Sequence, residues 1–126
     1  LRDVASPADG ILTGQEIVAQ DMHGTELVVL SGCPGDNATD SDPEVPTLLP
    51  TAFRLAGARA VVAAIWQLTD REATMLMVTF HENLAGGMSK TEALRQAQLS
   101  AIKKRKARHG AAHPFYWASF RVYGVE

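Results

Sequence analysis

The stretch ELVVLSGC, residues 26–33, decides the fold that we expect for this chain. Its apolar part, Leu27 to Leu30, is continuous and contains β-branched residues, which is typical of a strand buried on both faces of a parallel sheet. Cys33, the single cysteine of the sequence, follows the end of this strand. A lone cysteine is most often a small buried apolar residue. However, open α/β sheets bind ligands at the carboxyl ends of their strands, so a thiol here is well placed for nucleophilic attack.

The rest of the chain alternates between apolar runs and amphipathic segments. We expect further strands at 60–66 and 117–123, and helices at 14–20, 47–56, 70–85 and 90–108. Pro50 is expected in the first turn of its helix, where a missing N–H costs little. This alternation predicts an α/β fold with a mostly parallel sheet and helices on both faces. The strand before Cys33 should be central and adjacent to the strand at 60–66.

Side chains that cap free backbone N–H groups mark the expected helix starts. Thr13 with Glu16, and Ser89 with Glu92, have the spacing of a capping box. Asp70 is expected to be the N-cap of the helix that follows it.

The composition bounds the class of protein. A chain of 126 residues, 46% of them hydrophobic, is about one globular domain, and its formal net charge of −2 gives no general reason to expect nucleic acid. The longest apolar run, 56–66, is far shorter than the roughly 20 residues of a membrane span, and the N-terminus lacks the pattern of a signal peptide. One cysteine cannot form an internal disulfide, which fits a reducing compartment. We therefore expect a cytoplasmic protein.

Four segments, in this order, resemble the CHAT domain, a caspase-like domain related to separase and often found with tetratricopeptide repeats. They are DGILT with EI (9–17), ELVVLSGC (26–33), AGARAVV with Trp66 (56–66) and HPFYWASF (113–120). They span nearly the whole chain. Each is weak alone, but four in register identify the chain as similar to this family and imply a caspase-like fold.

The resemblance implies that Cys33 is the catalytic cysteine of a thiol protease. The family's catalytic histidine lies in a His-Gly pair before the DGILT-like segment, and this sequence has no such pair. None of its four histidines, at positions 23, 81, 109 and 113, is favoured as the base. We therefore expect residues 1–126 to be the C-terminal part of one caspase-like domain. The histidine and the first strands would come from another chain or from an upstream segment, and residues 1–126 alone should not hydrolyse peptides.

Three charged features are candidates for recognition. The segment WQLTDRE (66–72) resembles the separase segment whose aspartate receives a P1 arginine, which implies a substrate-binding role for Asp70 beside its role as a helix cap. The acids of 36–44 could meet a basic substrate, but a solvated loop explains them as well. The basic cluster of 103–108 favours the negative end of its helix, although an acidic or nucleic-acid partner stays open.

The expected function is therefore that of a cysteine endopeptidase with a Cys-His dyad and a protein or peptide substrate. The alternative is a non-catalytic CHAT-like module that binds a partner through the same cleft. The histidines and Cys33 have no metal-ligand spacing, so we expect neither a metal nor an organic cofactor. Tetratricopeptide repeats are candidate partners. Neither a membrane nor direct binding of nucleic acid is expected.

Overall fold

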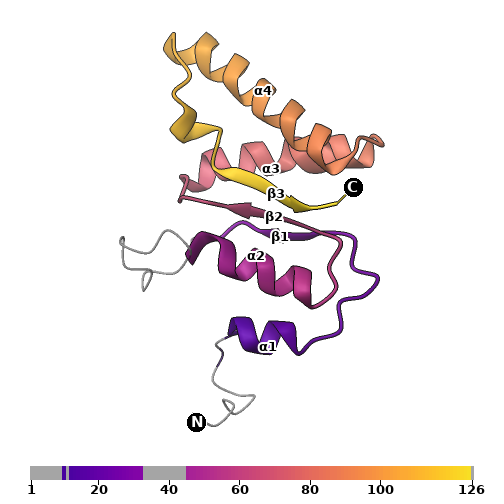
Figure 1. The fold of residues 1–126 in the computed structure, drawn as a ribbon. Coiled ribbons are helices and arrows are strands. Elements are labelled where there is room, and N and C mark those ends of the chain that lie inside the picture. The colour runs from indigo at the N-terminus through magenta and orange to yellow at the C-terminus, as the bar shows by residue number, and fades with distance from the viewer. Residues whose placement is uncertain (1–9, 11, 33–44, 126) are drawn as a thin grey trace.

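The structure, a computed structural model, describes residues 10, 12–32 and 45–125, and its three strands form one sheet. The strands are β1 (Val28–Leu30), β2 (Ala60–Ala64) and β3 (Phe120–Gly124). The helices are α1 (Gly14–Val18), α2 (Val45–Leu55), α3 (Asp70–Ala85), α4 (Lys90–His109) and the 3₁₀ helix η1 (Pro114–Tyr116). Figure 1 shows the sheet between two helical layers, with α1 and α2 on one face and α3 and α4 on the other. The prediction of helices on both faces is therefore confirmed.

The sheet is mixed, not mostly parallel as the sequence predicted. β1 runs parallel to β2, with Val28 opposite Val61 and Leu30 opposite Ala63. β3 runs antiparallel to β2. In the order β1-β2-β3 the central strand is β2, so β1 is an edge strand among the described strands, whereas we had expected it to be central. The expected adjacency of the strand before Cys33 to the strand at residue 60 is confirmed.

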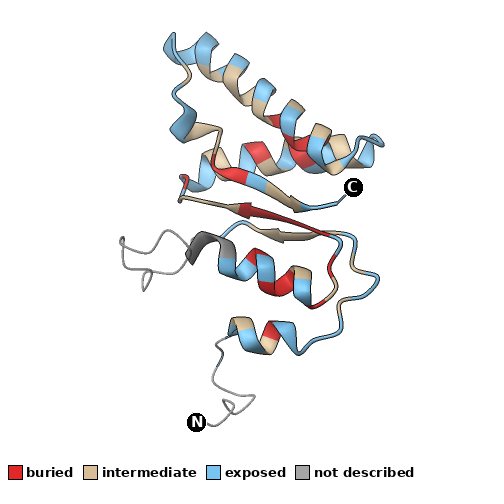
Figure 2. Ribbon diagram, in the orientation of Figure 1, coloured by how far each residue is buried: buried red, intermediate tan, exposed pale blue. Residues whose placement is uncertain are grey.

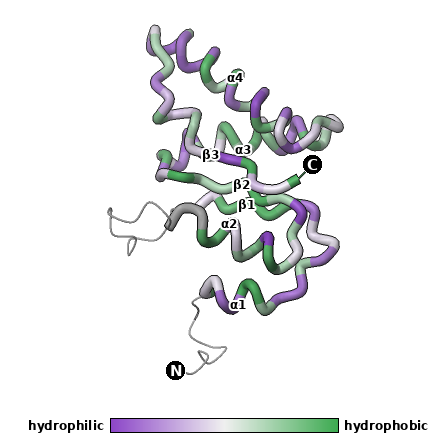
Figure 3. The backbone as a smooth tube through the Cα atoms, viewed as in Figure 1, coloured by the Kyte–Doolittle hydropathy of each residue, from purple (hydrophilic) through white to green (hydrophobic). Residues whose placement is uncertain are grey.

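Alternation along β2 divides the core into two clusters. Val62 packs with Leu76 and Phe80 of α3 and with residues of α4. Val61 and Ala63 point to the opposite face, where α1 and α2 contribute apolar side chains. The buried segments in Figure 2 follow this pattern, with β2 at the centre of both clusters. Figure 3 shows hydrophobic residues on the strands, whereas much of α4 is hydrophilic.

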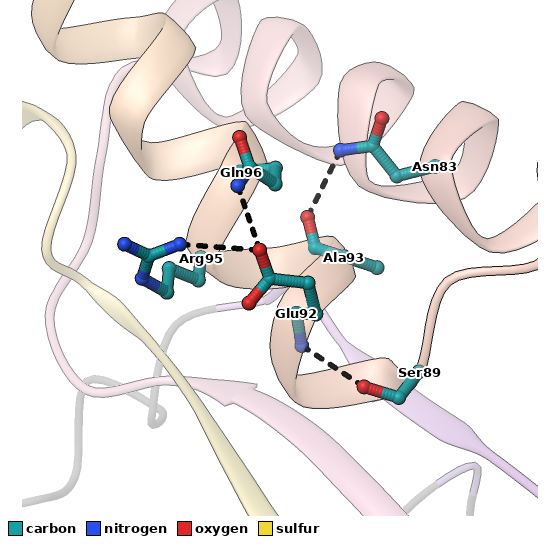
Figure 4. A network of polar contacts seen from close by, with 6 residues as sticks. All are labelled: Asn83, Ser89, Glu92, Ala93, Arg95 and Gln96. Carbon is teal, nitrogen blue, oxygen red and sulfur yellow. Dashed lines mark hydrogen bonds and ion pairs between the residues drawn. The ribbon is translucent and has the colours of Figure 1, made fainter.

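Side-chain caps begin the helices largely as predicted. Thr13 and Glu16 form a complete capping box, because the Glu16 carboxylate accepts from the Thr13 N–H at 2.7 Å and the Thr13 hydroxyl accepts from the Glu16 N–H at 3.3 Å. At α4 the Ser89 hydroxyl accepts from the Glu92 N–H at 3.3 Å. The Glu92 carboxylate instead accepts from Gln96 at 2.6 Å and from Arg95 at 3.1 Å (Figure 4).

Several boundaries differ from the predictions. α2 begins at Val45, so Pro50 lies inside the helix and not in its first turn. β2 ends at Ala64 instead of residue 66. The segment at 114–116 is a 3₁₀ helix, and β3 therefore begins at Phe120, three residues later than predicted.

Candidate functional site

The carboxyl ends of the parallel strands β1 and β2 form the candidate site. β1 ends at Leu30, and the exposed residues Ser31 and Gly32 follow it. The predicted nucleophile, Cys33, lies outside the described residues, as do the acids of 36–44. The nearest described parts of the site are therefore Ser31 and Gly32, together with the loop after β2 and the first turn of α3.

A cavity of about 120 Å³ joins these parts. Its lining includes Ser31 and Gly32 from the end of β1, Trp66 and Leu68 from the loop after β2, and Asp70 from the first turn of α3. A second cavity, of about 450 Å³, also touches Ser31 and Asp70 and continues along α3 as far as His81. The structure thus brings Asp70 to the end of the strand that precedes Cys33.

Asp70 is not the N-cap of α3, contrary to the prediction. The N-cap is Thr69, whose side chain accepts from the Glu72 N–H at 3.4 Å. Asp70 is the first residue of the helix, and its exposed side chain has no hydrogen-bond or ion-pair partner among the described residues. The sequence contained the signal for the correct cap, since Glu72 follows Thr69 at the capping-box spacing. The carboxylate of Asp70 is consequently free to meet a ligand.

Ser119 fixes the loop that leads to Asp70, and we did not single it out from the sequence. It is fully buried. Its hydroxyl donates to the Trp66 carbonyl and accepts from the Trp66 N–H at 3.4 Å. The Ser119 carbonyl accepts from the Ile65 N–H at 2.8 Å. A buried serine between tryptophan and phenylalanine in the HPFYWASF segment was the available signal, because a buried hydroxyl needs partners.

The Trp66 side chain provides a second link between the loop and the C-terminal segment. Its indole N–H donates to the Phe115 carbonyl at 2.8 Å, and the two rings stack with centroids 6.3 Å apart. His113 precedes these residues as the N-cap of η1, where its Nδ1 accepts from the Phe115 N–H at 3.1 Å. His113 therefore has a structural, hydrogen-bonding role. Two of the segments that carry the family resemblance are thus packed together to support this end of the sheet.

The four histidines are dispersed over the molecule. His23 lies against Gly57 before the start of β2, at the opposite end of the parallel strands. Its hydrogen bond to Asp21, at 2.7 Å, is the main reason why the pKa of the Asp21 carboxyl lies below its ordinary value. His109 is in the last turn of α4.

His81 is the histidine that shares a cavity with Ser31 and Asp70. It lies 11 residues after Asp70 on α3, which corresponds to roughly 16 Å along the helix axis. Its Nδ1 is 2.7 Å from the Met77 carbonyl and donates to it. At that separation His81 and Asp70 cannot act on the same substrate atom.

Among the described residues, no group of three or more His, Cys, Asp or Glu side chains could hold a metal ion. Within the same residues, no helix has both the length and the apolar character needed to cross a membrane.

Comparison with known proteins supplies the family. Residues 1–125 match the CHAT domain. The mouse (Mus musculus) protein "Tetratricopeptide repeat protein 28" is 30% identical to this chain over 78 residues, which are 62% of the chain and 3% of that protein. The chain therefore spans only a small part of the length of this relative. Because the family match covers essentially the whole chain, the chain belongs to the CHAT domain family, which is related to the caspase-like proteases.

Proposed function

We propose that this chain supplies the nucleophile, Cys33, of a cysteine endopeptidase with a Cys-His dyad. The observation that carries the proposal is the cavity shared by Ser31, Gly32 and Asp70, because it opens where β1 ends, immediately before Cys33 in the sequence. Ligands of open α/β sheets bind at this end of the strands. Membership of a protease-related family supports the same reaction class.

The base of the dyad comes from outside residues 1–126. This inference rests on the four histidines of the chain: His23 and His109 are on other parts of the molecule, His113 caps η1, and His81 is along α3. The second edge of β1 supports the inference, because β1 pairs with β2 alone among the described strands. An unpaired strand edge readily accepts a further strand.

The proposed reaction is the hydrolysis of a peptide bond. The histidine takes the proton from the Cys33 thiol, and the thiolate attacks the substrate carbonyl carbon. Backbone N–H groups near Cys33 and beside the histidine stabilise the oxyanion. The histidine then returns the proton to the leaving amine, which departs and leaves a thioester. Attack by water on the thioester releases the carboxylate product and restores the thiol.

Asp70 sets the preference for the P1 residue in this proposal. Its carboxylate is exposed, lines the cavity at the end of β1, and has no partner among the described residues. An arginine side chain that enters the cavity would form a charge-assisted, bidentate pair with it. Where the bound substrate buries such a pair, loss of one member typically costs about 2–5 kcal/mol. We therefore propose arginine as the preferred P1 residue.

Tetratricopeptide repeats are the partners that we propose for the domain. The support is the similarity to a protein named for such repeats, of which this chain covers a small part.

The decisive experiment uses the full-length protein that contains this chain and a library of fluorogenic peptides that differ at P1. Cys33→Ala should abolish turnover, and Asp70→Asn should reduce kcat/KM for arginine peptides by about 30-fold or more while changing that for leucine peptides less than about threefold. Thr69→Ser keeps the cap hydroxyl beside Asp70 and is the matched control, with unchanged selectivity.

Two results would contradict the proposal. Turnover that survives Cys33→Ala would remove Cys33 as the nucleophile. A wild-type protein that binds peptides in the library without cleaving any would favour the non-catalytic binding module.

A further inference from the structure

A separate groove lies between α3 and α4, on residues that the proposed protease reaction does not use. It has a volume of about 290 Å³. Met75 and Leu76 of α3 and Ala97 and Ala101 of α4 contribute its apolar surface. Met75 is 40% exposed, which is a large fraction for an apolar side chain at the centre of a helix.

The charged rim of the groove is strongly basic. Arg71, Lys104, Arg105 and Arg108 line it, whereas Glu72 is the only acid among the described residues that does so. Glu72 is already paired with Arg105 at 3.0 Å, and the side chains of both are partly buried. Among the described residues, the other three cations have no acidic partner. A local excess of positive charge on a chain of formal net charge −2 therefore marks this groove.

Helix electrostatics explains only part of this charge. Cations in the last turn of α4, such as Arg108, stabilise the negative end of the helix. Arg71, by contrast, is in the first turn of α3, where the helix dipole disfavours a cation. Lys104 precedes the last turn of α4. These two residues come from different helices and converge on the same groove, which points to an anionic ligand.

The groove fits an acidic peptide better than a nucleic acid. Among the described residues, its lining contains no Phe, Tyr or Trp on which a base could stack. The ring of Tyr116, which Arg105 of the lining contacts, is covered by the Arg105 guanidinium at 3.2 Å from the ring centroid. The lining extends from residue 97 to 109 along α4, roughly 18 Å, which is about three helical turns.

We propose that the α3–α4 groove binds an amphipathic helix of a partner protein, with apolar residues on one face and Asp or Glu beside them. The apolar side chains of that helix would cover Met75 and the alanines, as in other helix-in-groove complexes. Its carboxylates would pair with Arg71, Lys104 and Arg108. These charge pairs would attract the partner helix to the groove and fix its position along it.

The test measures binding of a fluorescein-labelled peptide of about four helical turns, with Leu at positions i, i+3, i+4 and i+7 and Glu at the others. Fluorescence anisotropy is recorded at physiological ionic strength with the full-length protein that contains this chain. The double variant Lys104→Glu/Arg108→Glu should weaken binding at least about tenfold, because two of the three unpaired cations are reversed. Met75→Ser should weaken binding about threefold or more through loss of apolar contact.

The matched control is Lys103→Glu/Lys106→Glu. It changes the net charge equally on the same helix, also alters one residue of the last turn, and touches two exposed side chains outside the groove. It should change affinity less than about twofold. Circular dichroism confirms that both double variants are folded.

An equal loss of affinity in the two double variants would show general charge attraction and would overturn the proposal. So would a wild-type chain that fails to bind the peptide, or one that binds a single-stranded oligonucleotide more tightly than the peptide.

Discussion

At the amino end of the parallel strands, backbone hydrogen bonds join one loop to the next, whereas at the carboxyl end the loops separate around cavities. The Met22 N–H donates to the Ala56 carbonyl at 2.8 Å, and the Arg59 N–H donates to the Thr25 carbonyl at 2.9 Å. These bonds connect the segment that precedes β1 with the segment that precedes β2. Within the described residues, no backbone hydrogen bond connects Ser31 or Gly32 to the loop after β2. That loop is attached instead to β3, through Ser119.

This difference between the two ends determines whether a mutation affects mainly folding or also the candidate site. Loops that are tied by their own backbone leave no room for a ligand, and their alteration affects folding. Loops held by a few side chains leave cavities and carry the candidate site residues on a fixed sheet. We therefore expect mutations at the amino end to lower mainly the free energy of unfolding, and mutations at the carboxyl end to affect the site as well as the stability.

The largest loss of stability is expected for Gly57→Ala at the amino end. Gly57 has φ of +115°, and a Cβ there would be 2.9 Å from the backbone nitrogen of His23. Backbone strain and the clash together should lower the free energy of unfolding by about 2–4 kcal/mol, measured by urea denaturation.

Gly87→Ala is the control for this substitution. Gly87 also has positive φ, +93°, but a Cβ there would meet nothing within 4 Å. It should lose only the strain component, about 1 kcal/mol. Equal losses for the two variants would show that the contact with His23 does not matter.

The next largest effect is expected for Ser119→Ala at the carboxyl end. The variant leaves the Trp66 carbonyl and N–H without the buried hydroxyl, at a cost of about 1–3 kcal/mol. Amide hydrogen exchange should accelerate at Trp66 more than at Ile65, because the Ile65 N–H donates to the Ser119 carbonyl, which the substitution retains. Equal acceleration of exchange at both amides would show that the Ser119 hydroxyl does not hold Trp66 locally.

A smaller effect distinguishes the two neighbouring residues at the start of α3. Thr69→Ala removes the N-cap and should cost about 1 kcal/mol. Asp70→Asn removes only a favourable charge in the first turn, which contributes about 0.3–1 kcal/mol. Thermal unfolding of both variants checks the order. A larger loss for Asp70→Asn would show that the Asp70 charge contributes more to α3 than the Thr69 cap does, and would weaken the assignment of Asp70 to the site.

The smallest expected effect concerns pH. Hydrogen bonding to Gln96, and then the charge and hydrogen bond of Arg95, hold the pKa of Glu92 below its ordinary value, and His23 does the same for Asp21. A carboxyl with a lowered pKa in the folded state stabilises the protein above its unfolded-state pKa. That stabilisation is lost as the pH falls through the lower, folded-state value.

Unfolding of the double variant Asp21→Asn/Glu92→Gln should therefore depend less on pH in the acidic range than unfolding of the wild type. Urea denaturation at several acidic pH values measures the slope. A slope in the double variant equal to that of the wild type would contradict the lowered pKa values of Asp21 and Glu92.

Much of the fold could be predicted from apolar patterning, because buried runs such as Val28–Leu30 and Ala60–Ala64 are continuous and flanked by turn residues. The direction of β3 could not be predicted, since a run of apolar residues has the same pattern in either orientation. The length of β2 was overestimated because Ile65 and Trp66 hydrogen-bond to Ser119, a partner 53 residues from Trp66. Periodicity contains no information on such contacts.

The candidate site was predictable in its location but not in its details. Chain order alone predicted that Asp70 lies near the end of β1. Ser31 follows β1, Asp70 follows β2, and these two strands are parallel neighbours. The assignment of the cap to Asp70 was wrong, since Asp and Thr have similar capping preferences and the choice depended on Glu72. The roles of Cys33 and Asp70 stay predictions. The groove between α3 and α4 could not be foreseen from sequence, because it depends on how two helices are placed against each other.

The mixed sheet has a mechanical consequence. The segment that continues to residue 33 leaves from β1, whereas the loop that carries Asp70 is clamped to β3, which pairs with β2. Among the described residues, only three residue pairs of the sheet, Val28–Val61 to Leu30–Ala63, join these two parts, and the backbone bonds of Met22 and Arg59 lie at the opposite end of the strands. Force applied along β1, for example by a strand added to its unpaired edge, therefore acts in shear on a short parallel interface. Any slip there would change the spacing between Gly32 and Asp70.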